Sequence, residues 1–163
     1  TSFPSLITSL IINGKKMPLE VSGLKEYILF FGTVDKYKGV DLLVDAYCNL
    51  TCKSLKLVIA GRGFDIETHN ENIIRINRFI EDEEVAYLFK KAKFIVYPYR
   101  SATMSGVLSL AYYFNKKVLA STIPFCFPAV NAKHIACTDI NINAVSSGII
   151  FCKYCSHRIL SPY

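Results

Sequence analysis

A glycine-bounded turn with two lysines is the segment of this 163-residue sequence best suited to chemistry. It runs from Gly32 to Gly39, contains Lys36 and Lys38, and follows an apolar stretch. Ammonium groups and the free backbone N–H groups that open a helix both bind phosphate. The turn lacks the spacing of a P-loop or of a dinucleotide fingerprint. Two interpretations therefore stay open: a phosphate site, or a strand end with a solvated lysine.

A second segment of interest, Arg100–Val107, leads into an almost wholly apolar stretch. An apolar helix there would be buried, and its first turn would carry backbone N–H groups that need partners. Thr103 or Ser105 could cap the helix, and Gly106 would let a bulky anion approach the backbone. A capped structural helix and a diphosphate site are equally compatible with this pattern. A third loop, Gly61-Arg62-Gly63, adds one cation.

The elements that must position these loops alternate between strand and helix patterns. Apolar runs predict strands at 27–31, 55–60, 73–76, 94–97 and 117–120 and a weaker one at 148–151, while helical spacing predicts helices from 39 to 50, 82 to 93 and 105 to 114. This alternation predicts crossover connections, and hence an α/β, Rossmann-like, doubly wound parallel sheet. Ligands of such sheets bind beyond the carboxyl ends of the strands, where all three loops would lie. After Pro128 the regular pattern weakens.

Composition narrows the class of protein further. Hydrophobic residues make up 52% and charged residues 20%, a balance that excludes a disordered chain. The net charge of +6 suits an anionic partner or simple solubility, but the scattered basic residues predict no nucleic-acid binding. The charge-free stretches are too short to span a bilayer, and the opening residues do not resemble a secretory signal. Six cysteines fit a reducing cytoplasm, and Cys152, Cys155 and His157 supply only half of a zinc-site spacing, so no metal is expected.

Four ordered blocks together carry more specificity than any single loop. They read FFGTVDKYKGVDLL, LVIAGRG, FIEDEEVAYLFKKAKFIVYPY and RSATMSGVLSLAYYFNKKVLAS. This order resembles the donor-binding half of a GT-B glycosyltransferase, and more narrowly the large family 4 of nucleotide-sugar transferases. The resemblance covers about Tyr27 to Ser121.

The resemblance implies roles for individual residues. In the family, the positions of Gly32 and Lys38 hold the donor's diphosphate, and a helix N-terminus at Ser105, Gly106 and Val107 faces the same phosphates. The backbone at Phe79 and Ile80 would meet the nucleotide base. With the two cations of neighbouring loops, the expected donor-binding residues are Gly32, Lys38, Arg62, Phe79, Ile80, Arg100, Ser105, Gly106 and Val107. No catalytic residue is assigned, and no metal or other cofactor is expected, because the nucleotide sugar is a substrate.

The activity implied is transfer of a sugar from a UDP- or GDP-type donor to an acceptor hydroxyl, with retention at the anomeric carbon, in glycan or surface polysaccharide synthesis. Three positions depart from the family pattern. Ala102 and Leu110 stand where relatives commonly have glutamates, and Asp35 stands where nearer relatives have an arginine. The alternative left open is a non-catalytic or split-transferase subunit that keeps the fold and needs a partner chain.

The resemblance also divides the chain. Residues 1–25 are expected to be a linker or the remnant of a preceding domain, 26–152 the Rossmann-like nucleotide-sugar-binding domain, and 153–163 an irregular tail. The partners expected are a nucleotide diphosphate sugar, a separate acceptor-domain chain and a peripheral contact with the inner face of the membrane, with a cytoplasmic location. Whether the chain is an enzyme by itself is left open, since the residues before Tyr27 in this sequence are not expected to form an acceptor domain.

Overall fold

The computed structural model describes residues 11, 13–50, 54–101, 106–121 and 135–137, the last three by their backbone alone. These residues form a twisted sheet of six parallel strands in the order β3-β2-β1-β4-β5-β6. The strands are β1 (Tyr27–Phe31), β2 (Lys56–Ala60), β3 (Ile73–Ile76), β4 (Ala92–Tyr97), β5 (Lys117–Ala120) and β6 (Ile135–Cys137).

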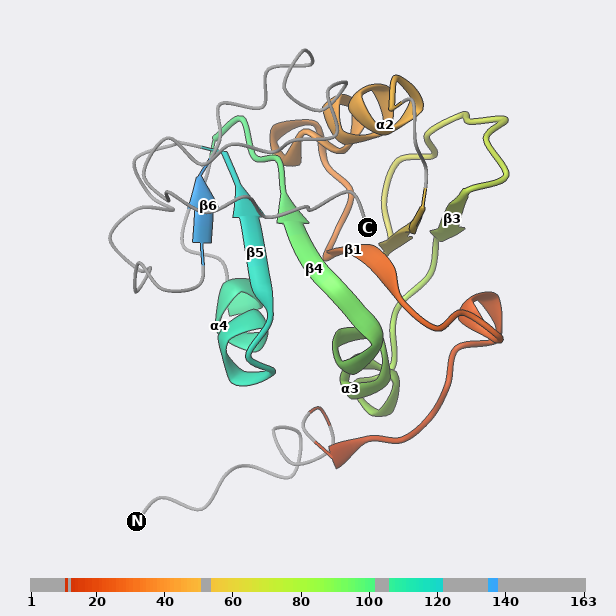
Figure 1. Ribbon diagram of the computed structural model, residues 1–163, viewed down its shortest axis with the longest axis vertical. Helices are drawn as coiled ribbons and strands as arrows, with labels where there is room; N and C mark the ends of the chain where they lie inside the picture. Colours follow the sequence, from red (N-terminus) through yellow and green to blue (C-terminus); the bar gives the residue numbers. More distant parts are fainter. Residues whose placement is uncertain (1–10, 12, 51–53, 102–105, 122–134, 138–163) are drawn as a thin grey trace.

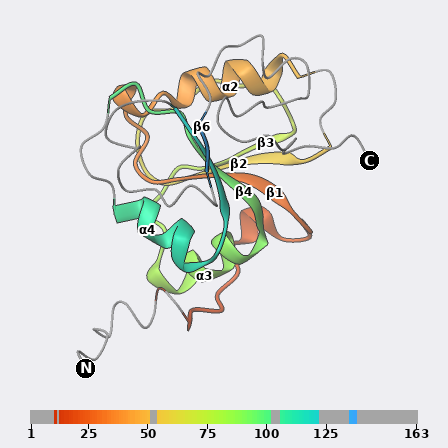
Figure 2. The same ribbon diagram turned by 60° about the vertical axis from the view of Figure 1, so that its left-hand side comes forward.

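Helices cover both faces of this sheet. The α-helices are α2 (Val40–Cys48), α3 (Asp82–Lys91) and α4 (Gly106–Tyr113), and the short 3-10 helices are η1 (Leu19–Val21) and η2 (Lys36–Lys38). Figure 1 shows the sheet, and Figure 2 shows α2 on one face with α3 and α4 on the other. The predicted α/β doubly wound parallel sheet is confirmed.

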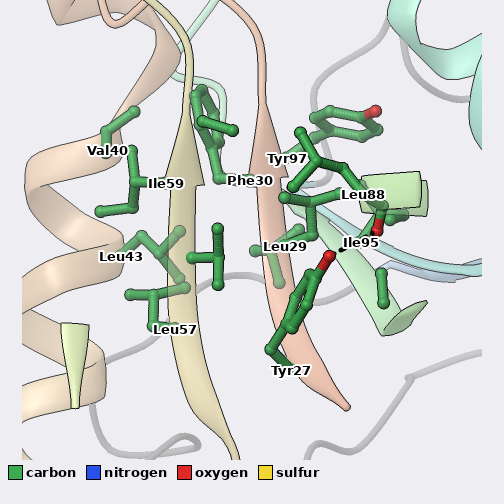
Figure 3. Packing of buried hydrophobic residues seen from close by; sticks show 14 of the residues in the cluster. Tyr27, Leu29, Phe30, Val40, Leu43, Leu57, Ile59, Leu88, Ile95 and Tyr97 are labelled. Carbon is green, nitrogen blue, oxygen red and sulfur yellow. Dashed lines mark hydrogen bonds between the residues drawn. The ribbon is translucent and has the colours of Figure 1, made fainter. Parts of the chain in front are cut away.

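The core forms where the central strands are apolar on both faces. Leu29 and Phe30 of β1 and residues 57–60 of β2 have no exposed surface. Figure 3 shows Val40 and Leu43 of α2 on the side of β2 that carries Leu57 and Ile59. Strands buried on both faces need continuous apolar runs, which is why YILFF and LVIA form the middle of the sheet.

Helix α3 has a start signal in its own sequence and a hydrogen bond to the sheet. Glu81 and Glu84 form a capping box, in which the backbone N–H of Glu81 donates to Glu84 Oε2 at 3.0 Å. Nearer its end, the helix is bound to the sheet by the buried hydroxyl of Tyr27, which donates to the carbonyl of Leu88 at 3.0 Å (Figure 3). Burial raises the pKa of the Tyr27 hydroxyl, so it stays a neutral donor.

Two expectations need correction. A sixth strand forms at Ile135–Cys137, in a stretch where the sequence predicted no regular element, and pairs with β5. A three-residue strand is too short to give a detectable period. Helix α4 was expected to be buried, but within it only Ala111 is, because the helix packs on the sheet by one side. The strand predicted at 148–151 lies outside the described residues.

Part of the range expected to be a linker packs on the domain. Val21 is fully buried, and Glu20 accepts hydrogen bonds from Arg78 at 2.9 and 3.2 Å. Arg78 also binds Glu84 of α3 at 2.8 and 2.9 Å. The hydrogen bonds to Glu84 and Glu20, together with the charges of these carboxylates, raise the pKa of Arg78. The segment before β1 is thus held against the start of α3.

The strand order decides where a ligand can sit. The chain leaves β1 for β2 and β3 on one side, then returns to place β4 and β5 on the other side of β1. The connections diverge at this switch point, and the general rule for open α/β sheets predicts a ligand crevice there, beyond the carboxyl ends of β1 and β4.

Candidate functional site at the carboxyl edge of the sheet

The turns after β1 and β2 continue side by side beyond the sheet. The N–H of Gly32 donates to the carbonyl of Ala60 at 3.0 Å, and the N–H of Val34 donates to the carbonyl of Arg62 at 2.9 Å. Val34 and Gly63 form a parallel bridge. These backbone contacts fix the relative position of the two loops.

This close approach explains the Gly61-Arg62-Gly63 spacing. Gly61 has φ +138°, and a Cβ on it would lie 2.1 Å from the carbonyl oxygen of Gly32. Gly63 has φ +156°, and a Cβ there would lie 2.2 Å from the carbonyl oxygen of Val34. The glycines are needed for backbone packing. Arg62 between them is exposed at the same edge.

Arg100 joins the loop after β4 to η2. Its N–H donates to the carbonyl of Tyr37 at 2.8 Å, and its guanidinium donates to the carbonyl of Lys36 at 2.8 Å. The same guanidinium forms a bidentate pair with Asp41 at 2.8 and 2.6 Å, which lowers the pKa of Asp41. The structure thus gives this expected donor-binding residue protein partners, and its contacts hold η2 in place.

Lys38 is the buried cation of the site. Its side chain is 9% exposed, and Nζ donates to Thr33 Oγ1 at 2.5 Å. Within the described residues this is its one hydrogen bond, and the ring of Tyr37 lies 5.6 Å from Nζ. Burial lowers the pKa of Lys38, and the charge of Asp35 opposes that shift. An ammonium has three donors, so two directions remain for a ligand.

Lys38 and the start of α4 converge on Gly32. A Cβ built on Gly32, which has φ +132°, would lie 3.6 Å from Lys38 Nζ and 3.8 Å from Val107 Cγ2. The first turn of α4 is anchored by the Tyr97 hydroxyl, which donates to the carbonyl of Val107 at 3.2 Å. Gly106 is exposed, with nothing within 4 Å of a Cβ on it. A cation and a side chain from the first turn of α4 therefore flank one glycine.

Two more of the expected residues, Phe79 and Ile80, belong to the loop after β3. Phe79 follows β3 with 74% of its surface exposed, whereas Ile80 is buried at 7%. Arg78 donates to the carbonyl of Phe79 at 3.1 Å. Ser105 and Ala102 lie outside the described residues.

Sequence reasoning missed two polar residues at this edge. Thr33 Oγ1 donates to Asp35 Oδ2 at 2.9 Å while accepting from Lys38. Arg75 donates to the carbonyls of Ile59 and Gly61 at 3.1 and 2.7 Å, where β2 ends. A lone arginine inside the apolar run IIRI was the available signal for Arg75. No comparable signal marks Thr33, because its role depends on how the turn folds.

Two negative findings concern the described part of the chain. Its His, Cys, Asp and Glu side chains form no group that could hold a metal ion. None of its helices is both long and apolar enough to cross a membrane.

The order of the parallel strands and the helices on both faces of the sheet define a Rossmann-like α/β domain. The chain belongs to the family of glycosyl transferases group 1, whose sequence profile matches residues 25–150. A search of curated proteins finds no match. The family expected from the ordered blocks is confirmed.

Solved structures share the fold. Sucrose-phosphate synthase from Thermosynechococcus elongatus has a TM-score of 0.62 at 17% identity, over 76% of this chain and 35% of that one. The C-terminal domain of a glycosyl transferase group 1 family protein, LpcC from Francisella tularensis, has a TM-score of 0.62 at 13% identity, over 86% and 83% of the two chains. Anabaena HepE, solved with UDP and glucose, has a TM-score of 0.59 at 14% identity, over 79% and 40%. This chain thus spans about two fifths or less of the synthase and of HepE.

Proposed function

We propose that this domain binds the diphosphate of a nucleotide sugar in the crevice between β1 and β4, and supplies the donor half of a retaining glycosyltransferase. The observation that carries this proposal is the convergence of Lys38 Nζ and the first turn of α4 on Gly32. Family membership and the fold shared with a protein solved with UDP and glucose support it.

The chemistry that these groups supply is electrostatic. When the bond between the sugar and the diphosphate breaks, negative charge collects on the leaving phosphate oxygens. An ammonium ion and helix N–H groups aimed at that charge lower the barrier, since they are already oriented when the charge develops. Burial of Lys38 strengthens this effect because the surrounding dielectric is lower than in water. The site would act without a bound metal.

The finer assignments extend this proposal. The acceptor would be a hydroxyl of a glycan or surface polysaccharide precursor, presented by a separate domain or chain. Exposed Phe79 and the adjacent backbone would meet the base, and Arg62 would add a cation at the rim. A cytoplasmic location with contact at the inner membrane face would fit such an acceptor.

A second candidate function is favoured by Leu110. In the family its position commonly holds a glutamate, but here the leucine is partly buried and packs against the core. It offers no hydrogen-bond acceptor to a ribose or sugar. A domain of this kind would bind a partner chain and contribute no transfer of its own. Addition of a purified acceptor-domain chain should restore sugar transfer in a split transferase and leave it absent in a non-catalytic protein.

The test of the main proposal is isothermal titration with UDP, GDP, their glucose and mannose conjugates, UMP and uridine. We expect one or more diphosphate ligands to bind, and UMP and uridine to bind at least about tenfold more weakly, because they lack the second phosphate that Lys38 would contact. Binding should persist in EDTA. Failure of every diphosphate ligand to bind would contradict the proposal.

A pair of glycine variants locates the binding event. Gly32→Ala should abolish or strongly weaken diphosphate binding, because the methyl group would enter the space between Lys38 and Val107. Gly23→Ala is the matched control, since Gly23 also has a positive φ, +84°, but has nothing within 4 Å of a Cβ. Both variants place an alanine at a positive φ. Equal effects on binding would place the ligand elsewhere.

A further inference from the structure

The turn after β1 contains a linear chain of three polar side chains. Lys38 Nζ donates to Thr33 Oγ1 at 2.5 Å, and Thr33 Oγ1 donates to Asp35 Oδ2 at 2.9 Å. A threonine hydroxyl has one proton, so once it is given to the carboxylate the oxygen can only accept from the ammonium. The order carboxylate, hydroxyl, ammonium is therefore set by the donors and acceptors themselves.

We propose that Thr33 and Asp35 are positioning residues that hold Lys38 ready for the diphosphate before the donor arrives. This inference rests on the proposed function and deepens it. A lysine ends a flexible four-carbon stem, and a ligand that had to order the stem would bind more weakly for that reason. Thr33 accepts a hydrogen bond from Nζ, which lies 3.6 Å from the Cβ position of Gly32.

The separation between the charges of Asp35 and Lys38 matters for ligand binding. A carboxylate in direct contact with Lys38 would satisfy the ammonium and compete with phosphate. Asp35 instead binds the ammonium through Thr33, so its charge supports the protonated form of a buried lysine while the remaining donors stay open. This gives a function to an acid that stands where nearer relatives have an arginine.

The surroundings of Lys38 leave few other groups for this task. Within the described residues, Asp35 is the charged side chain whose field acts on Lys38, and the uncharged ring of Tyr37 lies 5.6 Å away. From α4, apolar Val107 faces the same glycine. The acid at the next helix, Asp41, is bound by Arg100. Within the described residues, the carboxylate of Asp35 thus supports this ammonium through the hydroxyl of Thr33.

The experiment compares Thr33→Val, Thr33→Ser and Asp35→Asn, with UDP as the probe. Thr33→Val keeps the shape of an exposed side chain and removes the hydroxyl. Loss of one hydrogen bond that orients the ammonium should weaken UDP binding about two- to tenfold. Thr33→Ser should restore binding, and Asp35→Asn should fall between, because an amide oxygen still accepts from Thr33 but carries no charge. Thr68→Val is the matched control, since within the described residues the Thr68 hydroxyl has one hydrogen-bond partner, the nearby backbone N–H of Asn70.

A second readout needs no ligand. The titration of the Lys38 ammonium is followed by NMR in protein with labelled lysine side chains. Thr33→Val and Asp35→Asn should lower the pKa of Lys38 further, Thr33→Ser should leave it close to that of the parent, and Thr68→Val should not change it. A pKa of Lys38 unchanged by Thr33→Val, or UDP affinity equal in all four variants, would overturn the positioning role. Absence of UDP binding by the parent protein would instead contradict the proposed function, so the two failures are distinguishable.

Discussion

Lys38 and Lys116 are two partly buried lysines at opposite edges of the same sheet. Burial lowers the pKa of both side chains. Lys116, just before β5, donates to the carbonyls of Lys90 and Ala92 at 2.7 and 2.8 Å, where α3 ends. The ammonium of Lys38, which lies just after β1, makes one hydrogen bond within the described residues, to Thr33.

The difference lies in what each ammonium binds. Lys116 satisfies carbonyl groups that the end of a helix leaves without partners, and its charge complements the negative end of the helix dipole. Lys38 is more deeply buried than Lys116, yet within the described residues its ammonium has a single hydrogen-bond partner. A buried lysine thus indicates a binding site only when the protein leaves part of its hydrogen-bonding capacity unused.

The largest expected effect is that of Lys38→Met on ligand binding. Removal of a charge-assisted hydrogen bond to a phosphate should weaken UDP or GDP binding about 10- to 100-fold. The free energy of unfolding should be unchanged or higher, since the desolvated ammonium is gone. Calorimetry and urea unfolding measure the two quantities. Unaltered nucleotide affinity would remove Lys38 from the site.

Lys116→Met should produce the opposite pattern. The carbonyls at the end of α3 lose their partner, so the free energy of unfolding should fall by about 1–2 kcal/mol. Nucleotide affinity should stay the same, because Lys116 lies at the other edge of the sheet. Loss of nucleotide binding in this variant would contradict the different roles assigned to the two lysines.

The pH dependence of binding gives an intermediate effect. The pKa of Lys38 lies below 10.5, so its ammonium is lost before that of an ordinary lysine as the pH rises. Affinity for UDP should therefore decline from neutral pH toward 10.5, and Lys38→Met should remove this decline. Calorimetry across this range measures both profiles, and a parent affinity that stays constant with pH would contradict the role of the ammonium.

Folding stability should change in the opposite direction over that range. The unfolded chain keeps a lysine protonated up to about 10.5, whereas the folded chain releases the proton earlier. Since the unfolded state then binds more protons, the contribution of each lysine to stability rises with pH. Urea unfolding at several pH values should show a smaller rise in either methionine variant. A rise of equal size in all three proteins would contradict the lowered pKa values.

The smallest effect is expected from Arg100→Gln. Its bidentate pair with Asp41 is largely exposed, at 42% and 56% of the two side chains, so the loss in stability should be about 0–1 kcal/mol. UDP affinity should fall by about threefold or less through looser packing of η2. A loss as large as that of Lys38→Met would instead make Arg100 a direct ligand of the donor, as the sequence suggested.

Long apolar runs made the centre of the fold predictable. Tyr27–Phe31 and Ile73–Ile76 are strands with the predicted bounds, and α3 begins at Asp82 as its acids indicated. These elements carry their signals locally, in side-chain period and capping residues. The start of β4 at Ala92 and the strand β6 depend on pairing with neighbouring strands. Pairing between distant residues leaves no local pattern.

The candidate site was predictable in its parts. The turn at Gly32 and the helix that includes Gly106 were located from residue types, but the partners of their side chains were not. Arg100 has the same appearance in the sequence whether it binds phosphate or Asp41. The hydroxyl of Thr33 becomes informative only when the turn brings it to Lys38.

By itself, the sequence determined the family, the alternation of strands and helices, and the glycine and lysine positions that a phosphate site requires. The tertiary structure decided how many hydrogen bonds each cationic side chain makes to described residues. It also decided that Lys38 and α4 meet at Gly32. The physical reason is that hydrogen bonds and desolvation depend on distances between groups far apart in the chain. Those distances exist only once the strands have paired and their carboxyl ends share one edge.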